Sequence, residues 1–285
     1  MTKQLQGKPI AITGASSGIG RASAIACARA GMPIALGARR VDRLEEVKGE
    51  IESAGGRAVV VECDVTNRAD NEALVRACVD EFGSVYAVLA NAGFGFEARS
   101  HEVPEDRLRD IFETNFFGCM HTVQAALPSM IERGEGHVLI VSSCIGKLPV
   151  PYFGPYCATK AAQWHMASAM RMELASSGIE VSSVHPVGTK TDFFDEAKRR
   201  SKPPKGAGSS LDDHSPDFLM QRPETVANAI VNGLKRPKPE VWPSAARMVG
   251  VAMCFANMWP RLPQWFMRRG MVRKMERRIA SAQAE

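Results

Sequence analysis

The stretch that decides the fold is Pro9-Ile10-Ala11-Ile12-Thr13-Gly14-Ala15-Ser16-Ser17-Gly18-Ile19-Gly20. It opens with an apolar run typical of a buried strand, and an Ala-rich helical pattern from Arg21 to Ala30 follows it. A strand, a glycine-rich turn and a helix in this order can cradle a phosphate, because glycines let the backbone approach a ligand and a helix N-terminus favours an anion. Turn glycines with no ligand would show the same spacing. We predict that the following residues bind a dinucleotide: Gly14, Ser16, Ser17, Gly18, Ile19 and Gly20.

Outward from this stretch, strand and helix patterns alternate along the chain without an internal repeat. Further strands are predicted at Pro33–Gly37, Ala58–Glu62, Val85–Ala90, His137–Ser142, Ile179–Val184 and, at one edge, Pro239–Trp242. Helices are predicted at Val41–Ala54, Asn67–Phe82, Pro104–Arg133, Pro155–Ser177 and Pro223–Leu234. This alternation predicts an α/β fold with a doubly wound parallel sheet and helices on both faces. Ligands of such sheets bind beyond the carboxyl ends of the strands.

Composition and charge fit a globular protein that does not bind nucleic acid through its main body. The chain has 285 residues, of which 45% are hydrophobic and 24% charged. The net charge of +5 comes from the end of the chain, because Arg247 to Glu285 hold eight Lys or Arg and two Glu, leaving −1 for the rest. The seven cysteines show no C-x-x-C spacing, and the polar N-terminus shows no secretory signal. We therefore predict reduced thiols, a cytoplasmic location and no metal site.

Two arginines follow the second predicted strand, where an NAD-binding protein commonly has a carboxylate for the ribose 2′-hydroxyl. Arg39 and Arg40 could instead pair with a 2′-phosphate, which predicts NADP(H) as the cofactor, with Ser16 assisting. An arginine pair that only solvates a helix start is the alternative.

A candidate proton donor lies in the stretch Tyr156-Cys157-Ala158-Thr159-Lys160. On a helix, residues i and i+4 share a face, so the phenol of Tyr156 and the ammonium of Lys160 would be neighbours. A nearby positive charge lowers the pKa of a phenol and makes it a better acid-base group. Two ordinary surface side chains would have the same spacing. Ser143 lies upstream at a predicted strand end, and Asn115 lies inside a predicted helix as a functional kink or a tolerated polar residue.

Together these motifs resemble those of the short-chain dehydrogenase/reductase family, over about Lys8 to Trp242. The motifs are Thr13-Gly-Ala-Ser-Ser-Gly-Ile-Gly20, Asn91-Ala92-Gly93, Asn115, Ser143 and Tyr156-Cys-Ala-Thr-Lys160. Two positions depart from the family pattern: Ala90 stands where the family commonly has Asn, and Val187 separates Pro186 from Gly188.

The resemblance implies a Rossmann-type sheet of about seven strands and a catalytic tetrad formed by Asn115, Ser143, Tyr156 and Lys160. Hydride would pass between NADP(H) and a carbonyl or alcohol carbon while Tyr156 transfers the proton. Ser143 would donate to the developing oxyanion, and Asn115 would hold a water that connects Lys160 to solvent. Further cofactor contacts implied by the resemblance are Asp64 and Val65 on the adenine side, Asn91, Ala92 and Gly93, and Pro186, Val187, Gly188, Thr189 and Thr191. Pairing of the two long helices in this family implies a homodimer or homotetramer.

The substrate is weakly encoded. Apolar loop residues face the expected site and favour an apolar carbonyl or alcohol substrate, although such residues also pack against one another: Phe94, Phe96, Ile145, Val150, Phe153, Val187, Phe193 and Phe194. Of these we predict Ile145, Phe153, Val187 and Phe194 as substrate contacts. A non-catalytic NADP(H)-binding protein or a membrane-associated scaffold of the same fold is the alternative function.

Two segments differ from the rest in composition. Within a domain of residues 1–242, residues 193–220 are rich in Lys, Ser, Pro and Gly, which fits either a lid over the substrate or a disordered insertion. Residues 243–285 form an apolar and basic extension, predicted to be helical. Its Trp, Phe, Arg and Lys residues suit peripheral membrane contact. A helix that covers the cleft or a partner subunit would also fit.

Overall fold

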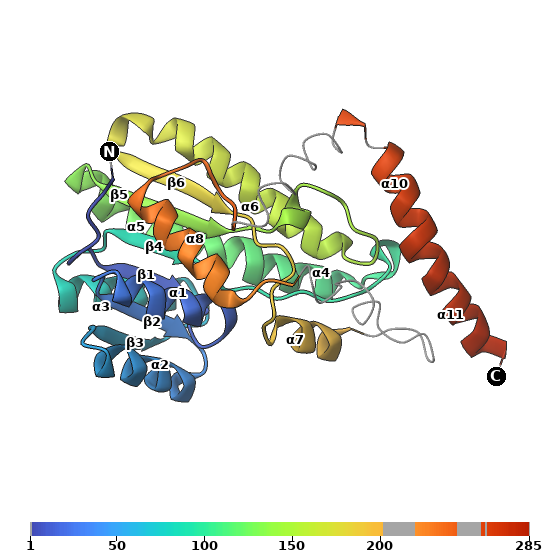
Figure 1. The fold of residues 1–285 in the computed structure, drawn as a ribbon, viewed down its shortest axis with the longest axis horizontal. Helices are drawn as coiled ribbons and strands as arrows, with labels where there is room; N and C mark the ends of the chain where they lie inside the picture. The colour runs from blue at the N-terminus through green and yellow to red at the C-terminus, as the bar shows by residue number, and fades with distance from the viewer. Residues whose placement is uncertain (1, 202–219, 244–257, 260, 285) are drawn as a thin grey trace.

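Seven parallel strands form the centre of the computed structural model, which describes residues 2–201, 220–243, 258–259 and 261–284 (Figure 1). Their order is β3-β2-β1-β4-β5-β6-β7. Their bounds are Ile10–Thr13 (β1), Ile34–Ala38 (β2), Ala58–Glu62 (β3), Ala87–Ala90 (β4), Gly136–Val141 (β5), Ile179–Val184 (β6) and Glu240–Val241 (β7). The chain runs from β1 outward to β3 and returns to β4 on the other side, so the strand order reverses between β1 and β4. A crevice for a ligand forms at such a reversal.

Helices cover both faces of the sheet, which confirms the doubly wound α/β fold. One face packs against α1 (Gly18–Arg29), α2 (Val41–Ser53) and α8 (Pro223–Lys235), and the other packs against α3 (Arg68–Phe82), α5 (Gly118–Arg133) and α6 (Gly154–Glu173). Successive strand residues alternate between the two layers: Ile10 and Ile12 face the first, and Ala11 faces the second. Apolar strands buried on both faces are what a parallel sheet requires.

The predicted helix Pro104–Arg133 is interrupted in the structure. It divides into α4 (Glu105–Phe112), a π-helical turn at Glu113–Phe117, and α5. The π-helical turn adds a residue to the helix and frees a backbone carbonyl from the regular ladder, a feature common at functional sites. It contains Asn115, so the polar residue in the helix interior marks a change in backbone geometry.

Residues 193–220, predicted as a lid or a disordered insertion, begin with a helix, which excludes disorder at their start. Phe193–Arg200 forms helix α7, which lies at the bottom of the view in Figure 1, near its middle. This helix is held to the loop that follows β4, because the Ser201 hydroxyl accepts a hydrogen bond from the Glu97 amide at 2.7 Å and the Arg107 side chain donates to the Arg200 carbonyl at 2.6 Å. Residues 202–219, the middle of the predicted lid, lie outside the described residues.

The C-terminal extension is helical where it is described, as predicted. It contains α10 (Arg261–Met267), a π-helical turn at Arg268–Val272, and α11 (Arg273–Ala284). Most of the apolar stretch Ala245 to Met258 lies outside the described residues. Within the part of the chain that the structure describes, every helix is too short or too polar to cross a bilayer.

Candidate active site

Asn115 is fully buried, and its side-chain amide joins the loop after β4 to helix α6. The amide nitrogen donates to the Phe94 carbonyl at 2.9 Å and to the Thr159 hydroxyl at 3.1 Å, while the amide oxygen accepts from the Phe94 backbone at 2.9 Å. The backbone carbonyl of Asn115 accepts a hydrogen bond from Gln163 at 2.5 Å. Asn115 therefore fixes the loop after β4 against α6.

Ser143 follows β5 at the carboxyl edge of the sheet, and its oxygen accepts a hydrogen bond from the Ile145 amide at 3.4 Å. Its backbone carbonyl is bonded to Nδ1 of His185 at 3.2 Å, and Nε2 of His185 is bonded to the Ser183 hydroxyl at 2.9 Å. Burial lowers the pKa of His185 to about 4, so the ring is neutral near pH 7. Because a carbonyl can only accept, the ring proton lies on Nδ1. The buried His185 thus holds the backbone of Ser143.

Tyr156 lies in the first turn of α6 and is 9% exposed. Burial raises the pKa of its hydroxyl, with the neighbouring Cys144 and Cys157 adding to the rise, whereas the Ser143 side chain lowers it. This direction is opposite to the one expected from the sequence. The reason is that burial dominates and that the Lys160 ammonium makes its hydrogen bonds to other groups. Tyr156 is therefore protonated in this structure and can act as a proton donor.

Lys160 lies on the same helix face, with Nζ 5.5 Å from the centre of the Tyr156 ring. It is 3% exposed and donates to the Val141 carbonyl at 2.8 Å and to the Gln163 amide oxygen at 2.9 Å. Burial lowers the pKa of Lys160 to about 8. The Gln163 side chain links Lys160 to the carbonyl of Asn115. The family resemblance implied that a water held by Asn115 would make this link.

The glycine-rich turn lies at the carboxyl end of β1, beside the reversal of strand order. Gly14 has a φ of 65°, a left-handed conformation that suits glycine. A Cβ at Gly20 would lie 2.2 Å from the Gly14 carbonyl oxygen, so this close approach of turn and helix needs glycine. The Asn91 amide donates to the carbonyls of Thr13 at 3.0 Å and of Gly14 at 3.3 Å, which fixes the turn from the neighbouring strand.

The start of α1 is suited to an anion. Ser17 precedes the helix and makes no capping hydrogen bond to it, so its side chain does not occupy the helix amides. Arg40 reaches across from the end of β2 and donates to the hydroxyls of Ser16 at 3.2 Å and of Ser17 at 2.9 Å. Arg39 is exposed and lies 4.0 Å from the Asp64 carboxylate. This donor set fits the phosphates of a dinucleotide.

The remaining predicted cofactor residues lie around the same crevice. Val65 is buried against Gly118, and its carbonyl accepts from Asn71 at 3.0 Å. Thr191, in the loop after β6, lies against the glycine-rich turn, since a Cβ at Gly18 would be 3.1 Å from the Thr191 methyl. The other positions lie in the same loops or at the start of α1. Ile19 packs on the core, the Ala92 amide donates to the Thr13 hydroxyl, and Gly93 lies against the Asn115 side chain. The loop that follows β6 contains Pro186, Val187, Gly188 and Thr189.

An apolar cluster adjoins the Tyr156 ring. Phe94 and Phe96 are buried there with Tyr156, and Ile145 packs against them. The Phe193 ring lies 5.3 Å from that of Tyr156, and the Phe194 ring packs on Phe193 at 5.6 Å. Among the predicted substrate residues, Phe194 is thus one ring further from Tyr156 than Phe193. Phe153, which directly precedes α6, is buried.

Two contacts near Lys160 were not predicted from the sequence. Thr159 is bonded to Asn115, and Gln163 is bonded to both Asn115 and Lys160. Helical spacing could have predicted the contact of Gln163, because it lies three residues after Lys160 on the same helix face. His185 could not be found in this way, because its contact with Ser143 depends on the pairing of β5 with β6.

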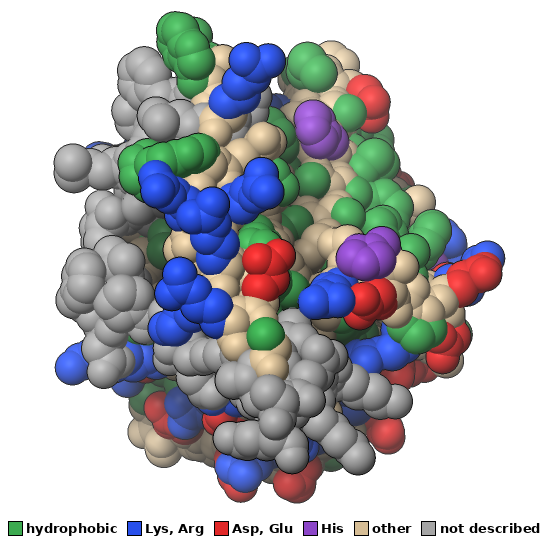
Figure 2. All heavy atoms as spheres, turned by 90° about the vertical axis from the view of Figure 1, so that its right-hand side faces the viewer, with side chains coloured by type: hydrophobic (Ala, Val, Ile, Leu, Met, Phe, Trp, Pro, Cys, Tyr) green, Lys and Arg blue, Asp and Glu red, His purple; other side chains and the backbone are tan. Residues whose placement is uncertain are grey.

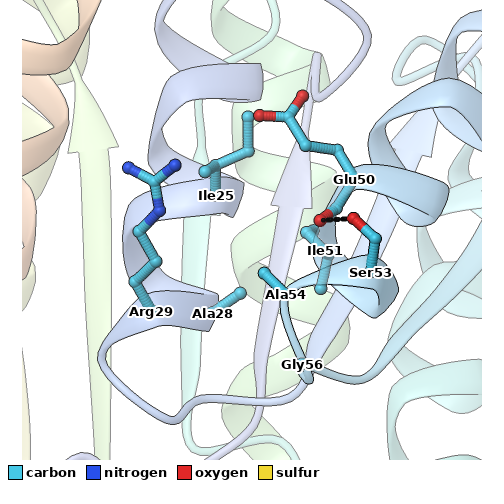
Figure 3. A pocket seen from close by; sticks show the side chains of 8 residues that line it. All are labelled: Ile25, Ala28, Arg29, Glu50, Ile51, Ser53, Ala54 and Gly56. Carbon is cyan, nitrogen blue, oxygen red and sulfur yellow. Dashed lines mark hydrogen bonds between the residues drawn. The ribbon is translucent and has the colours of Figure 1, made fainter.

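A separate pocket lies between α1 and α2, lined by Ile25, Ala28, Arg29, Glu50, Ile51, Ser53, Ala54 and Gly56 (Figure 3). It is near the C-terminal end of α1 and therefore at the amino ends of the strands, away from Tyr156. Ser53 donates to the Glu50 carbonyl within it at 2.9 Å. The pocket does not adjoin the residues described above.

Comparison with known proteins gives consistent results. Residues 8–202 match the family model described as short chain dehydrogenase. The chain is 33% identical over 244 residues to the uncharacterized oxidoreductase YbbO of Escherichia coli, covering 85% of this chain and 86% of that protein. It is 32% identical over 237 residues to the ketoacyl reductase HetN of a Nostoc species, covering 83% and 78%. The glycine betaine reductase ATRR of Emericella nidulans is 36% identical over 82% of this chain, which spans only 18% of that larger protein.

Two solved structures are also similar. An alcohol dehydrogenase from Thermococcus sibiricus, complexed with 5-hydroxy-NADP, is 31% identical with a TM-score of 0.70, covering 82% of this chain and 95% of that one. A 3-ketoacyl-(acyl-carrier-protein) reductase from Brucella melitensis, complexed with NADH, is 28% identical with a TM-score of 0.72, covering 84% and 98%. These neighbours were solved with different nicotinamide nucleotides.

Proposed function

We propose that this chain, which belongs to the short-chain dehydrogenase/reductase family, is an NADP(H)-dependent enzyme that interconverts a carbonyl and an alcohol on an apolar small molecule. The observation that carries the proposal is the grouping of the half-buried Ser143 with the buried Tyr156 and Lys160 at the carboxyl edge of the sheet, beside a turn suited to a dinucleotide. A protein that only bound a nucleotide would not need a buried lysine, because burying a charge is costly.

A nicotinamide cofactor supplies hydride chemistry when it is bound. In the reducing direction Tyr156 donates its hydroxyl proton to the substrate oxygen, and in the oxidising direction it accepts that proton. The Ser143 hydroxyl donates a hydrogen bond to the same oxygen and stabilises the charge that develops on it. Lys160 favours the phenolate left on Tyr156 by its positive charge, and Gln163 keeps the ammonium in place.

We propose NADP(H) over NAD(H) because basic and hydroxyl side chains surround the end of β2. Arg40 already contacts Ser16 and Ser17 there, and the Arg39 side chain is 69% exposed and accessible to a 2′-phosphate. Oδ1 of Asp64 accepts hydrogen bonds from the amide and hydroxyl of Thr66, and Oδ2 lies 4.0 Å from Arg39, so the pairing of Asp64 with Arg39 is loose.

Arg39→Ala is expected to weaken NADPH binding by roughly tenfold to hundredfold, since a hydrogen bond to a charged group contributes about 1.5–3 kcal/mol. The affinity for NADH should change little, because NADH lacks the 2′-phosphate. Fluorescence titration of both nucleotides measures the two dissociation constants. Arg43→Ala is the matched control, as Arg43 is an exposed arginine of α2 that pairs with Glu46. Tighter binding of NADH than NADPH by the unaltered protein would refute the NADP(H) proposal.

The apolar cluster around Tyr156 supports an apolar substrate. Apolar side chains pack around the Tyr156 ring: Phe94, Phe96, Ile145 and Phe193. This surrounding favours a substrate with a hydrocarbon or aromatic group next to its carbonyl. The test is the oxidation of NADPH in the presence of a panel of ketones and aldehydes graded from polar to apolar. Consumption that rises with apolar surface supports the proposal, and turnover of only the charged, polar members contradicts it.

We also propose a homo-oligomer in the cytoplasm. Phe117, Ile131 and Met172 are exposed on the long helical region around α5 and α6, and pairing of these helices between two copies would cover them. The six described cysteines are free and buried, as expected for reduced thiols. Sedimentation equilibrium of the full chain measures the oligomeric mass, and a monomer at micromolar concentration would contradict the proposal.

A further inference from the structure

The helical extension α10–α11 has an inward face made of apolar side chains. Pro263, Met267, Met271 and Met275 recur every four residues; the first three are partly buried, and Met275 is 5% exposed. Residues spaced by four lie on one side of a helix, so this stripe is the side on which the extension rests. The opposite side is left to face outward.

The extension rests beside the loops that border the candidate active site. The carboxylate of Glu276 in α11 lies near both Arg99 and Tyr152: it adds to the rise in the pKa of Arg99, which Glu102 mainly causes, and to the rise in the pKa of Tyr152, which burial mainly causes. The carbonyl of Tyr152 accepts a hydrogen bond from the Ala98 amide at 2.9 Å, and Phe153 is the next residue along the chain. Figure 1 shows α10 and α11 on the right, at the side of the molecule toward which the carboxyl ends of the strands point. The extension therefore lies on the side of the protein that holds the candidate active site, and its outward face points away from the protein on that side.

Large apolar side chains gather at one end of the outward face. Trp265 is 48% exposed and Phe266 is 60% exposed, and Met258 and Trp259, which precede α10, are exposed as well. The rings of Trp265 and Phe266 meet edge to face with their centres 4.9 Å apart. Aromatic groups exposed together in this way mark a surface that another phase or molecule covers.

Basic side chains continue the outward face beyond the aromatic end. Arg268, Arg269, Arg273 and Arg277 are exposed, and the guanidinium of Arg269 lies 4.5 Å from the centre of the Trp265 ring. Figure 2 looks onto this side of the molecule and shows Lys and Arg side chains gathered near its centre, with hydrophobic side chains above them. Glu276, the acidic residue of α11, is the one that lies near Arg99 and Tyr152.

We propose that the outward face of α10 and α11, named here the aromatic–basic face, docks on an anionic lipid surface. Trp and Phe rings prefer the boundary between headgroups and acyl chains, and arginines beside them pair with anionic headgroups. The helices lie on the surface, since none of those described could cross a bilayer. This docking holds the side of the protein with the candidate active site near the lipid. The docking proposal depends only on the residues of the extension. A consequence of it, that apolar substrates reach the site from the lipid, rests on the proposed function.

The test is sedimentation of the full chain with vesicles of phosphatidylcholine alone or of phosphatidylcholine mixed with phosphatidylserine. The chain is expected to sediment with the mixed vesicles at low salt, to be released as salt rises, and to stay in solution with phosphatidylcholine alone. Each arginine near an anionic surface contributes about fivefold to partitioning, so Arg268→Gln with Arg269→Gln should lower it roughly 25-fold. Trp265→Ala with Phe266→Ala should lower binding at every salt concentration.

Matched controls come from the main body. Arg43→Gln with Arg57→Gln removes two exposed arginines, and Leu108→Ala removes an exposed apolar side chain. Neither change should alter vesicle binding. Circular dichroism checks that each variant is folded, and Arg273→Gln is a second, single change on the same face. A chain that stays in the supernatant with mixed vesicles at low salt overturns the proposal. So does a Trp265→Ala, Phe266→Ala variant whose vesicle binding is unchanged while its oligomeric mass falls, because the face would then cover a second copy. Measurement of NADPH affinity on the same preparations separates this result from a failure of the proposed function.

Discussion

Tyr156→Phe is expected to reduce turnover by a factor of ~10² or more while leaving NADPH affinity nearly unchanged. The substitution removes only the hydroxyl, which is the proton donor next to Ser143, and keeps the ring that packs on Phe193. Because burial keeps Tyr156 protonated in the structure, the hydroxyl proton is present to be given to the substrate oxygen. Steady-state rates with an identified carbonyl substrate, together with nucleotide titration, measure both quantities.

Tyr152→Phe is the matched control. Tyr152 lies four residues before Tyr156 and is partly buried, and its substitution by Phe removes the same hydroxyl. The Tyr152 hydroxyl, however, lies near Arg99 and Glu276, whereas that of Tyr156 lies near Ser143. Its turnover should stay close to that of the unaltered chain. If Tyr156→Phe kept normal turnover, or if both variants lost activity equally, the assignment of Tyr156 as the acid-base group would be wrong.

Much of the fold could be predicted because its signals are local. The strands Ala58–Glu62 and Ile179–Val184 were predicted with the bounds that the structure shows. The first is a short apolar run, and the second has β-branched residues at Ile179, Val181 and Val184 between Gly178 and Pro186. The interruption at Glu113–Phe117 was predicted only as one of two explanations for Asn115, because the residues of a π-helical turn follow the same periodic pattern as the helices around it. Helix α7 was missed because its charged sequence, Phe193–Arg200, is held by contacts with distant residues such as Glu97 and Arg107.

The candidate site shows the same division between local and distant causes. The neighbouring placement of Tyr156 and Lys160 followed from helical spacing and is present in the structure. The effect on the phenol could not be predicted in that way, since the pKa of Tyr156 depends on how deeply α6 is buried. The bonds of the Lys160 ammonium to Val141 and Gln163 depend likewise on the packing of α6 against β5.

Lys160→Met is expected to reduce turnover more than Tyr156→Phe, by roughly 10³-fold. It removes the charge that stabilises the Tyr156 phenolate, and with it the contact proposed between Lys160 and the cofactor. The folded protein should survive the change. Burial lowers the pKa of Lys160 to about 8, which means that the charged form destabilises the fold; this cost is fully present below pH 8 and fades as the pH rises toward 10.5. Met avoids that cost and offsets the lost hydrogen bonds to Val141 and Gln163.

Lys147→Met is the matched control, and the two variants should show opposite losses. Lys147 is also buried, but its ammonium pairs with Glu240 at 2.5 Å, so removing it leaves a half-buried carboxylate without its cation. We expect Lys147→Met to lower the free energy of unfolding by about 2 kcal/mol, at the low end for buried pairs because Glu240 is partly exposed, and to retain most of the turnover. Urea unfolding and steady-state kinetics on both variants measure the two effects. If Lys160→Met lowered the free energy of unfolding enough to account for its loss of turnover, Lys160 would be a structural residue. The proton-transfer role proposed for Lys160 and Tyr156 would then be wrong.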